Sequence, residues 1–321
     1  MNKVLSSVLI VGFFFGVAYR KVSQEQSMEK ELRGTISISG AWALYPMVVK
    51  WAEEFQKIHS DVKIDVAAGG AGKGMADCLA QVVDIGMVSR DIYPSEVEKG
   101  AWWISVTKDA VVPTMNQNNP LSEELLAKGI KKETFIDIWI NGKVTNWGQV
   151  AGMESNDSIH VYTRSDACGA AKTWAGFLGG KQEDLLGVGV YGDPGLAEAM
   201  KRDVLGIGFN NINYAYDPKS QKQVDQIKIV PIDLNGNGVI DQDEDFYNER
   251  GEIVDAIAAG KYPSPPARLL HLVSQGKPQR KIVIEFLQWI LTDGQRYIPE
   301  SGYINLTEEK IQNEIKKLEG K

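Results

Sequence analysis

The chain is 321 residues long, which exceeds a typical single domain and indicates two. A hydrophobic share of 43% with a charged share of 24% is typical of a soluble globular protein. The net charge of −7, together with the lack of any lysine or arginine run, excludes a nucleic-acid-binding surface.

The N-terminal segment has the pattern of an export signal. Val4–Tyr19 is apolar and has basic residues on both sides. This core is short for a membrane span but long enough for a signal peptide. No small-residue cleavage site stands out, so a cleaved signal and an uncleaved membrane anchor both stay open. Residues 1–33 are assigned to this segment plus a polar linker. The body is expected in the periplasm or cell envelope, tethered to the membrane if the anchor is kept.

The body alternates predicted strands and helices. Pro46 opens a helix with an apolar face at spacings of three and four. Further elements follow in chain order: a strand at Val62–Val66, a helix at Met75–Val83, strands at Ile85–Val88 and Ala110–Met115, a second α/β block at Leu121–Tyr214, a return crossing at Tyr214–Asp217, a strand at Arg268–Val273 and an amphipathic helix at Gln279–Leu291. This alternation predicts an α/β fold with parallel strands covered by helices.

Two glycine-rich or small-residue turns carry the first indication of a ligand. Gly69–Gly74 and Arg164–Trp174 each follow a predicted strand and open a helix. Unpaired N–H groups and the positive end of the helix dipole attract anions, and the Arg164 guanidinium adds matched donors. Either turn alone is compatible with an ordinary strand–turn–helix junction. Two in one chain predict an anion held between facing helix starts.

A second candidate site is the segment Asp233–Glu244, which fits the twelve-residue calcium loop of EF-hands. Gly238 stands at the sharp turn and Ile240 at the apolar anchor position. The expected ligands are Asp233, Asn235, Asn237, the Val239 carbonyl, Asp241 and Glu244. The loop follows a strand rather than a helix and has no partner hand, so we expect a structural Ca²⁺ on an insertion of the first lobe. The alternative is a polar loop rich in Asn and Gly.

Several blocks of the chain, in order, give it a family resemblance from about Thr35 to Leu306. The blocks are Ile38–Pro46, Gly69–Gly74, Val83–Arg90, Lys108–Val112, Asn118–Pro120, Gly142–Trp147, Arg164–Ala170, Gly206–Phe209, and Gly294-Gln295 with Gly302-Tyr303. The chain resembles the substrate-binding proteins of bacterial phosphate ABC transporters. The resemblance implies the two-lobed periplasmic binding protein fold with two interlobe crossings. The expected first lobe is 34–115 and 215–321, including the calcium loop 233–244, and the second is 116–214.

The same resemblance implies an anion cleft between the lobes. The matching ligand positions are Ala43, Leu44, Gly70, Ala71, Ser89, Arg90, Arg164, Cys168, Gly169 and Ala170. Several departures remove hydroxyl donors: relatives have Thr at Leu44, Ser at Ala71, and Ser and Thr at Cys168 and Ala170. The cations Lys73, Arg90 and Arg164 stay, with Lys73 placed either in the cleft or in solvent. Asp84, Asp91 and Asp166 are the candidate acceptors for a protonated oxyanion.

The implied function is an exported, monomeric binding protein that captures phosphate or a similar oxyanion for an ABC transporter permease. An enzyme would depend on Cys168 as nucleophile, and no histidine lies near it in sequence to act as its base. The alternative is an envelope calcium-binding, adhesion or sensor protein whose cleft binds another ligand or none.

Overall fold

The computed structural model describes residues 32–320. The signal peptide or anchor predicted for the N-terminus lies almost wholly outside these residues. Within the described range, no helix is both long and apolar enough to cross a membrane.

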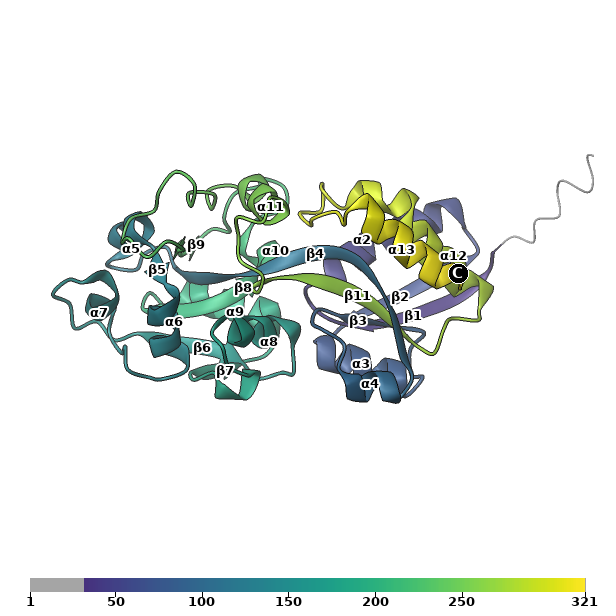
Figure 1. Cartoon of the computed structure of the whole chain (residues 1–321), viewed down its shortest axis with the longest axis horizontal. Coiled ribbons are helices and arrows are strands. Elements are labelled where there is room, and N and C mark those ends of the chain that lie inside the picture. The colour runs from purple at the N-terminus through teal and green to yellow at the C-terminus, as the bar shows by residue number, and fades with distance from the viewer. Residues whose placement is uncertain (1–31, 321) are drawn as a thin grey trace, which may run out of the picture.

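Two lobes lie end to end, and two long strands run through both of them (Figure 1). These strands are β4 (Ala101–Asn116) and β11 (Ala267–Gln275), which pair antiparallel. The predicted fold, an α/β chain in two lobes with two crossings, is confirmed. A single curled sheet has the strand order β2-β1-β3-β11-β4-β8-β6-β7, with β9 also paired to β4, so the crossing strands form its middle.

The first lobe contains parallel strands with helices on both faces. β1 pairs in parallel with both β2 and β3, as the alternating sequence predicts. Besides the two crossing strands, the elements of the first lobe are β1 (Gly34–Gly40), α2 (Tyr45–Ile58), β2 (Val62–Ala68), α3 (Ala71–Leu79), β3 (Ile85–Val88), α4 (Pro94–Glu98), α12 (Lys281–Leu291), η2 (Asp293–Tyr297) and α13 (Glu308–Glu319).

The second lobe repeats the design with β6 between β8 and β7, both parallel to it. Its elements are α5 (Ser122–Lys128), β5 (Ile130–Lys131), α6 (Lys132–Trp139), α7 (Trp147–Ala151), β6 (His160–Arg164), α8 (Gly169–Phe177), η1 (Gln182–Asp184), β7 (Val188–Val190), α9 (Gly192–Arg202), β8 (Gly206–Asn211), α10 (Ile212–Ala215), β9 (Ile227–Ile229), β10 (Ile232–Asp233) and α11 (Arg250–Ala258).

Each lobe has its own apolar core, and the crossing strands contribute to both. On β4, Ile104 belongs to the first core and Val111 to the second. On β11, Leu272 belongs to the first core and Ala267 to the second. The chain therefore passes between the lobes along these two strands.

The predicted return crossing at Tyr214–Asp217 is wrong. Tyr216, Ile229 and Tyr262 are buried in the core of the second lobe, and the chain returns only through β11. The stretch was misread because β9 pairs with the second half of β4, where both strands already lie in the second lobe. The second lobe thus extends well past residue 214.

Glycines on α3 and β1 explain why the first glycine-rich turn comes so close to the sheet. A Cβ on Gly40, whose φ is +134°, would stand 2.8 Å from the Gly74 Cα. A Cβ on Gly74 would in turn stand 2.6 Å from the Met87 carbonyl oxygen. Only glycine allows this approach, so part of the glycine pattern serves packing and holds the start of α3 at the end of β1.

Candidate anion-binding cleft

The starts of α3 and α8 face each other across the junction between the lobes. Gly72 N donates a hydrogen bond to the Ala167 carbonyl at 3.0 Å. Gly70, at φ +90°, lies so close to the other lobe that a Cβ there would stand 2.9 Å from Asp166 Oδ2. The juxtaposition of the two turns that the sequence predicts is therefore present.

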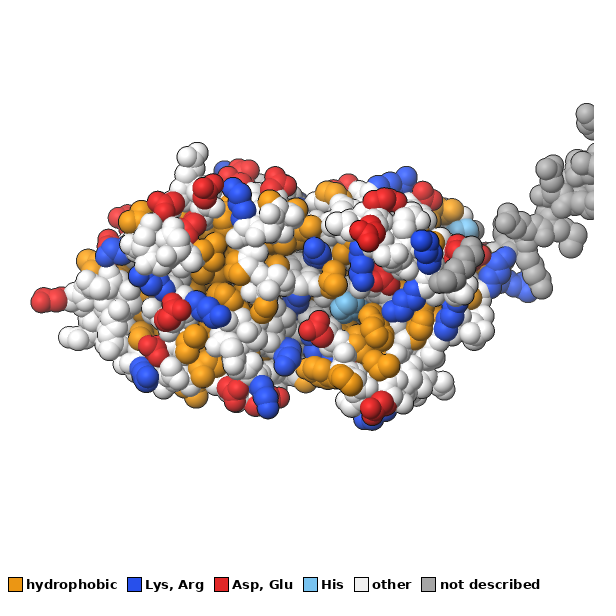
Figure 2. Space-filling model, viewed as in Figure 1, with side chains coloured by type: hydrophobic (Ala, Val, Ile, Leu, Met, Phe, Trp, Pro, Cys, Tyr) orange, Lys and Arg blue, Asp and Glu red, His pale blue; other side chains and the backbone are white. Residues whose placement is uncertain are grey.

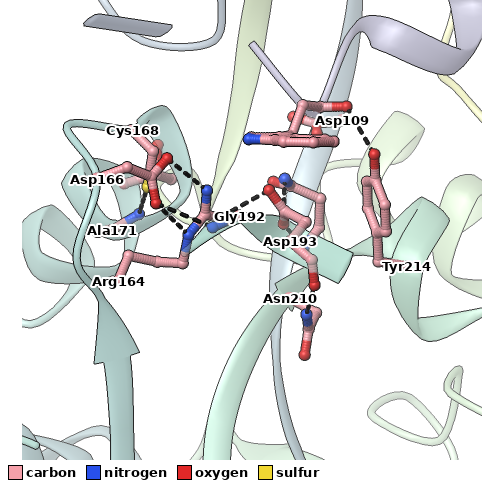
Figure 3. Close-up of polar contacts among 12 residues, drawn as sticks. Asp109, Arg164, Asp166, Cys168, Ala171, Gly192, Asp193, Asn210 and Tyr214 are labelled. Carbon is pink, nitrogen blue, oxygen red and sulfur yellow. Dashed lines mark hydrogen bonds and ion pairs between the residues drawn. The ribbon is translucent and has the colours of Figure 1, made fainter. Parts of the chain in front are cut away.

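Arg164 ends β6 and lies at the centre of a buried ionic cluster (Figure 3). Its Nε and Nη2 donate to the two carboxylate oxygens of Asp166 at 2.8 and 2.7 Å, and its Nη1 donates to Asp193 Oδ2 at 2.6 Å. The Arg164 side chain has no exposed surface. Burial disfavours the charge, but the carboxylates of Asp193 and Asp166 outweigh it and raise the pKa of Arg164 above its usual range.

Asp193 is a member of this cluster that the sequence reasoning missed. It accepts a hydrogen bond from Asn211 Nδ2 at 2.6 Å, and the neighbouring Gly192 N donates to Asp166 Oδ1 at 3.2 Å. The sequence held a signal for it: Gly192 and Asp193 follow β7 and open α9, a third strand–turn–helix junction of the kind already noted twice. Gly192, at φ +75°, needs the left-handed region that glycine supplies.

The crossing strands add a second buried ion pair next to the first. Arg268 on β11 donates to both oxygens of Asp109 on β4, with Nε–Oδ1 2.9 Å and Nη2–Oδ2 3.2 Å, and its Nη1 donates to Thr173 Oγ1 on α8 at 3.0 Å. Arg268 also contacts Asn211. Burial raises the pKa of Asp109, and Arg268 opposes that rise. Two guanidinium groups thus stand against three carboxylates, Asp109, Asp166 and Asp193, so the inner cluster carries one net negative charge.

The predicted ligand positions with aliphatic or thiol side chains are all buried. Ala43, Leu44 and Ala71 belong to the core of the first lobe, and Cys168 and Ala170 to that of the second. Their side chains offer no strong donors. Gly169 packs against Ser89, whose Oγ would lie 2.1 Å from a Cβ at the glycine.

Unpaired donors nevertheless remain at this junction. Among residues 32–320, no hydrogen-bond acceptor is found for the main-chain N–H groups of Ala71, Gly169 and Ala170, at the two helix starts. The buried Trp42 Nε1 also has no partner in the described part of the chain. Trp42 packs on Gly192, where a Cβ would stand 3.4 Å from this nitrogen. Buried donors without acceptors cost free energy, and an oxyanion would supply the missing acceptors.

Other predicted cations and acceptors lie elsewhere. Lys73 forms an ion pair with Asp77 and is half exposed, so it does not enter the cleft. Asp84 accepts from Ser37 N at 2.9 Å and pairs with Arg280. Asp91 is exposed. Of the three carboxylates predicted as acceptors, only Asp166 contacts Arg164.

Arg90 lies at the edge of the lobe junction rather than beside Arg164. Its Nη1 and Nη2 donate to the carboxylate of Glu96 at 3.0 and 2.7 Å, and its guanidinium lies 4.1 Å from the centre of the Tyr93 ring. The predicted site residues therefore separate into an inner group around Arg164 and an outer group around Arg90.

Cys168 caps α8 and is not arranged as a nucleophile. Its Sγ accepts from Ala171 N at 3.4 Å. Burial raises the pKa of the thiol to about 12, which keeps it protonated near neutral pH. Of the three histidines, His160 pairs with Asp203 and His271 with Ser105, and Cys168 contacts none of them.

The predicted calcium loop lies on the second lobe, not on the first as expected. β10 carries Asp233 and pairs in parallel with β5, and Ile240 N donates to the Ala127 carbonyl at 2.9 Å. The reason is the late return crossing, which leaves this whole stretch beyond β9 on the second lobe.

Within the loop, three of the side chains at the predicted ligand positions contact one another. Asp241 Oδ2 lies 2.9 Å from Asn235 Nδ2 and 2.8 Å from Asn237 Nδ2. Asp233 and Glu244 are 4% exposed and accept main-chain N–H groups of the loop. Across residues 32–320, no three His, Cys, Asp or Glu side chains are grouped as metal ligands; the predicted set here relies on two asparagines and a carbonyl as well.

Comparison with known proteins agrees with this geometry. The model of the PBP superfamily domain matches residues 25–294. The chain belongs to this superfamily. One similar protein is the phosphate-binding protein PstS of Xylella fastidiosa, which is 24% identical over 303 residues; the match covers 85% of this chain and 82% of the relative. Another is the phosphate-binding protein PstS of Methanocaldococcus jannaschii, which is 24% identical over 340 residues; the match covers 88% of this chain and 86% of the relative.

Similar solved structures have the same fold as this chain. One, from Clostridium perfringens, is described as a phosphate ABC transporter substrate-binding protein with bound phosphate. It superimposes with a TM-score of 0.69 at 22% identity, covering 85% of this chain and 100% of its own. These three relatives are named as phosphate-binding or substrate-binding proteins.

Proposed function

We propose that the chain is an exported solute-binding protein that captures phosphate or a similar oxyanion between its lobes and presents it to the permease of an ABC transporter. The names of the similar proteins support phosphate as cargo. We propose that the protein works as a monomer. Its place in the periplasm or cell envelope is supported by the apolar N-terminal segment, which serves as a leader or a tether.

The observation that carries this proposal is the set of unpaired N–H donors at two facing helix starts. The amides of Ala71, Gly169 and Ala170, together with Trp42 Nε1, come from both lobes. An oxyanion between them would satisfy donors from both lobes at once and so stabilise the closed arrangement. The lost hydroxyls at Leu44, Ala71 and Ala170 are each worth about 0.5–1.5 kcal/mol, so main-chain donors must do most of the binding.

Equilibrium dialysis of the mature chain against labelled phosphate tests the proposal. We expect saturable binding of one phosphate per chain, with competition by unlabelled phosphate. Absence of saturable binding at millimolar phosphate would contradict it.

We further propose that the loop 233–244 binds a structural Ca²⁺. Asp233 and Glu244 are buried carboxylates that contact no cationic side chain among the described residues, and Asp241 converges on Asn235 and Asn237. Buried carboxylates without a cation are costly, and a hard divalent ion matches their oxygens. With the Val239 carbonyl, the loop offers the six ligand residues that the sequence predicts.

Thermal unfolding with calcium, with chelator and with magnesium tests the loop. A ligand that binds only the folded state stabilises it by about 2.7 kcal/mol at a hundredfold excess over Kd. Calcium should raise the melting temperature of the wild type and of Asp243→Asn, whose side chain is 92% exposed and outside the predicted ligand set. Glu244→Gln should lose this rise. An equal rise in all three proteins, or none in any, would contradict the proposal.

A further inference from the structure

A cavity of about 310 Å³ opens at the junction between the lobes, outside the inner cluster. Arg90 and Tyr93 line it from the first lobe, and Cys168, Lys172 and Lys181 from the second. Small-molecule pockets start at about 300 Å³, so the space suits a ligand larger than a bare oxyanion. In the view of Figure 2, basic side chains lie in the lower part of the junction, between α4 and α8.

The cations of this cavity come from both lobes, and two of them lie over one aromatic ring. Arg90 lies 4.1 Å and Lys172 5.8 Å from the centre of the Tyr93 ring. Arg90 is paired with Glu96, whereas no ion pair of Lys172 or Lys181 is found among residues 32–320. Glu183 is the carboxylate of the lining. Three cations against Glu96 and Glu183 leave one net positive charge, opposite in sign to the inner cluster.

The cavity adjoins the inner cleft through Cys168. This residue lines the cavity and is the N-cap of α8, whose first amides are among the unpaired donors. Gly72, which contacts Ala167 across the junction, lines the same cavity. The starts of both α3 and α8 thus border the cavity.

We propose that this cavity is a second anion subsite, and that the chain takes a phosphorus oxyanion carrying a second anionic group. The proposal rests on the proposed function, since the first group occupies the helix starts. The second group belongs at Arg90, Lys172 and Lys181, because the inner cluster, with three carboxylates, repels additional negative charge and the outer cavity attracts it. An anion there bridges cations of both lobes and favours closure.

Calorimetric titration of the mature chain with pyrophosphate and, separately, inorganic phosphate tests the subsite. In the wild type, pyrophosphate should bind at least tenfold more tightly than phosphate. The double variant Lys172→Gln/Lys181→Gln should lose at least tenfold in pyrophosphate affinity and less than threefold in phosphate affinity. Lys143→Gln, an exposed lysine of the second lobe that does not line the cavity, is the matched control and should change neither.

The outcomes separate the two proposals. Phosphate binding without a pyrophosphate advantage, or a pyrophosphate affinity unchanged in the double variant, overturns the second subsite and leaves the proposed function standing. Binding of neither anion overturns both. Circular dichroism and the melting temperature of the double variant should match the wild type, because both lysines lie at the surface of the cavity rather than in a core.

Discussion

Asp193 Oδ2 lies 2.6 Å from Arg164 Nη1, and both side chains are buried. The guanidinium that the sequence marks as an anion ligand is therefore already held by carboxylates of its own chain, Asp166 on one edge and Asp193 on the other. Any anion in the cleft must bind beside these groups. We therefore expect Asp193 to affect the affinity for an anion although it supplies no positive charge.

Asp193→Asn should raise the affinity for inorganic phosphate at least tenfold. The substitution keeps the shape of the side chain but removes a negative charge that repels the ligand. It should also lower the free energy of unfolding by about 1–3 kcal/mol, because Arg164 or Asn211 loses an acceptor. Calorimetric titration and denaturant unfolding measure both. Asp203→Asn, a carboxylate of the same lobe that pairs with His160 at 2.7 Å, is the control. Phosphate binding by Asp193→Asn that is no tighter than that of the control would refute this role.

Gly169→Ala should prevent full closure of the lobes. The added Cβ would stand 2.1 Å from Ser89 Oγ and 2.2 Å from the Ser89 carbonyl oxygen, across the junction. We expect phosphate affinity to fall at least tenfold and the radius of gyration with phosphate, from small-angle scattering, to exceed that of the wild type. Gly176→Ala on the same helix meets its nearest atom at 4.0 Å and should bind like the wild type. Equal behaviour of the two variants would mean that this contact does not limit closure.

His271 should make the folded state sensitive to acid. Burial, then the charges of Lys310, Lys317 and Arg90, lower its pKa to about 4 from an ordinary 6.5. The unfolded chain takes up a proton at His271 as pH falls below 6.5, whereas the folded chain does so only near 4. Stability is therefore present above pH 6.5 and lost towards pH 4, by about 3 kcal/mol.

Denaturant unfolding between pH 7 and pH 4 measures this effect. His271→Gln keeps a polar partner for Ser105, whose Oγ lies 3.2 Å from His271 Nδ1, but cannot take up the proton. The stability of this variant should fall less steeply with acid than that of the wild type. Parallel curves for the two proteins would assign the acid sensitivity to other groups. His59→Gln, a partly buried histidine of the same lobe, serves as the matched control.

The sequence predicts the architecture because its signals are local. The apolar spacing after Pro46 gives α2, with Val48, Trp51 and Phe55 buried as expected. Ile58 at the helix end is exposed, since spacing alone does not tell where the neighbouring core stops. The return crossing was misplaced for a different reason: β9 extends the sheet beside β4, and strand pairing between distant segments leaves no local pattern.

The sequence predicts part of the site, because only some of its residues lie in local patterns. Arg164 and the two facing turns follow from strand–turn–helix patterns that can be read one at a time. The pairing of Arg164 with Asp193 and of Arg268 with Asp109 depends on how segments far apart in the chain meet. Lys73 is the opposite case. Its place in a glycine-rich turn predicts contact with a ligand, but the carboxylate of Asp77, one helical turn further along α3, pairs with it and keeps it at the surface.

The proposed function requires that an oxyanion binds between the lobes at the cluster around Arg164. Arg164→Ala is a poor test, since two buried carboxylates left without their cation would cost about 3–5 kcal/mol of stability. Arg164→Lys keeps the charge but lacks the planar fork that holds Asp166 and Asp193 together beside the start of α8, so the cleft loses its fixed geometry. In a calorimetric titration with inorganic phosphate, the wild type should bind one anion per chain and Arg164→Lys should bind at least tenfold more weakly while unfolding cooperatively. Equal affinity in the two proteins, or no binding to the wild type, would contradict the claim.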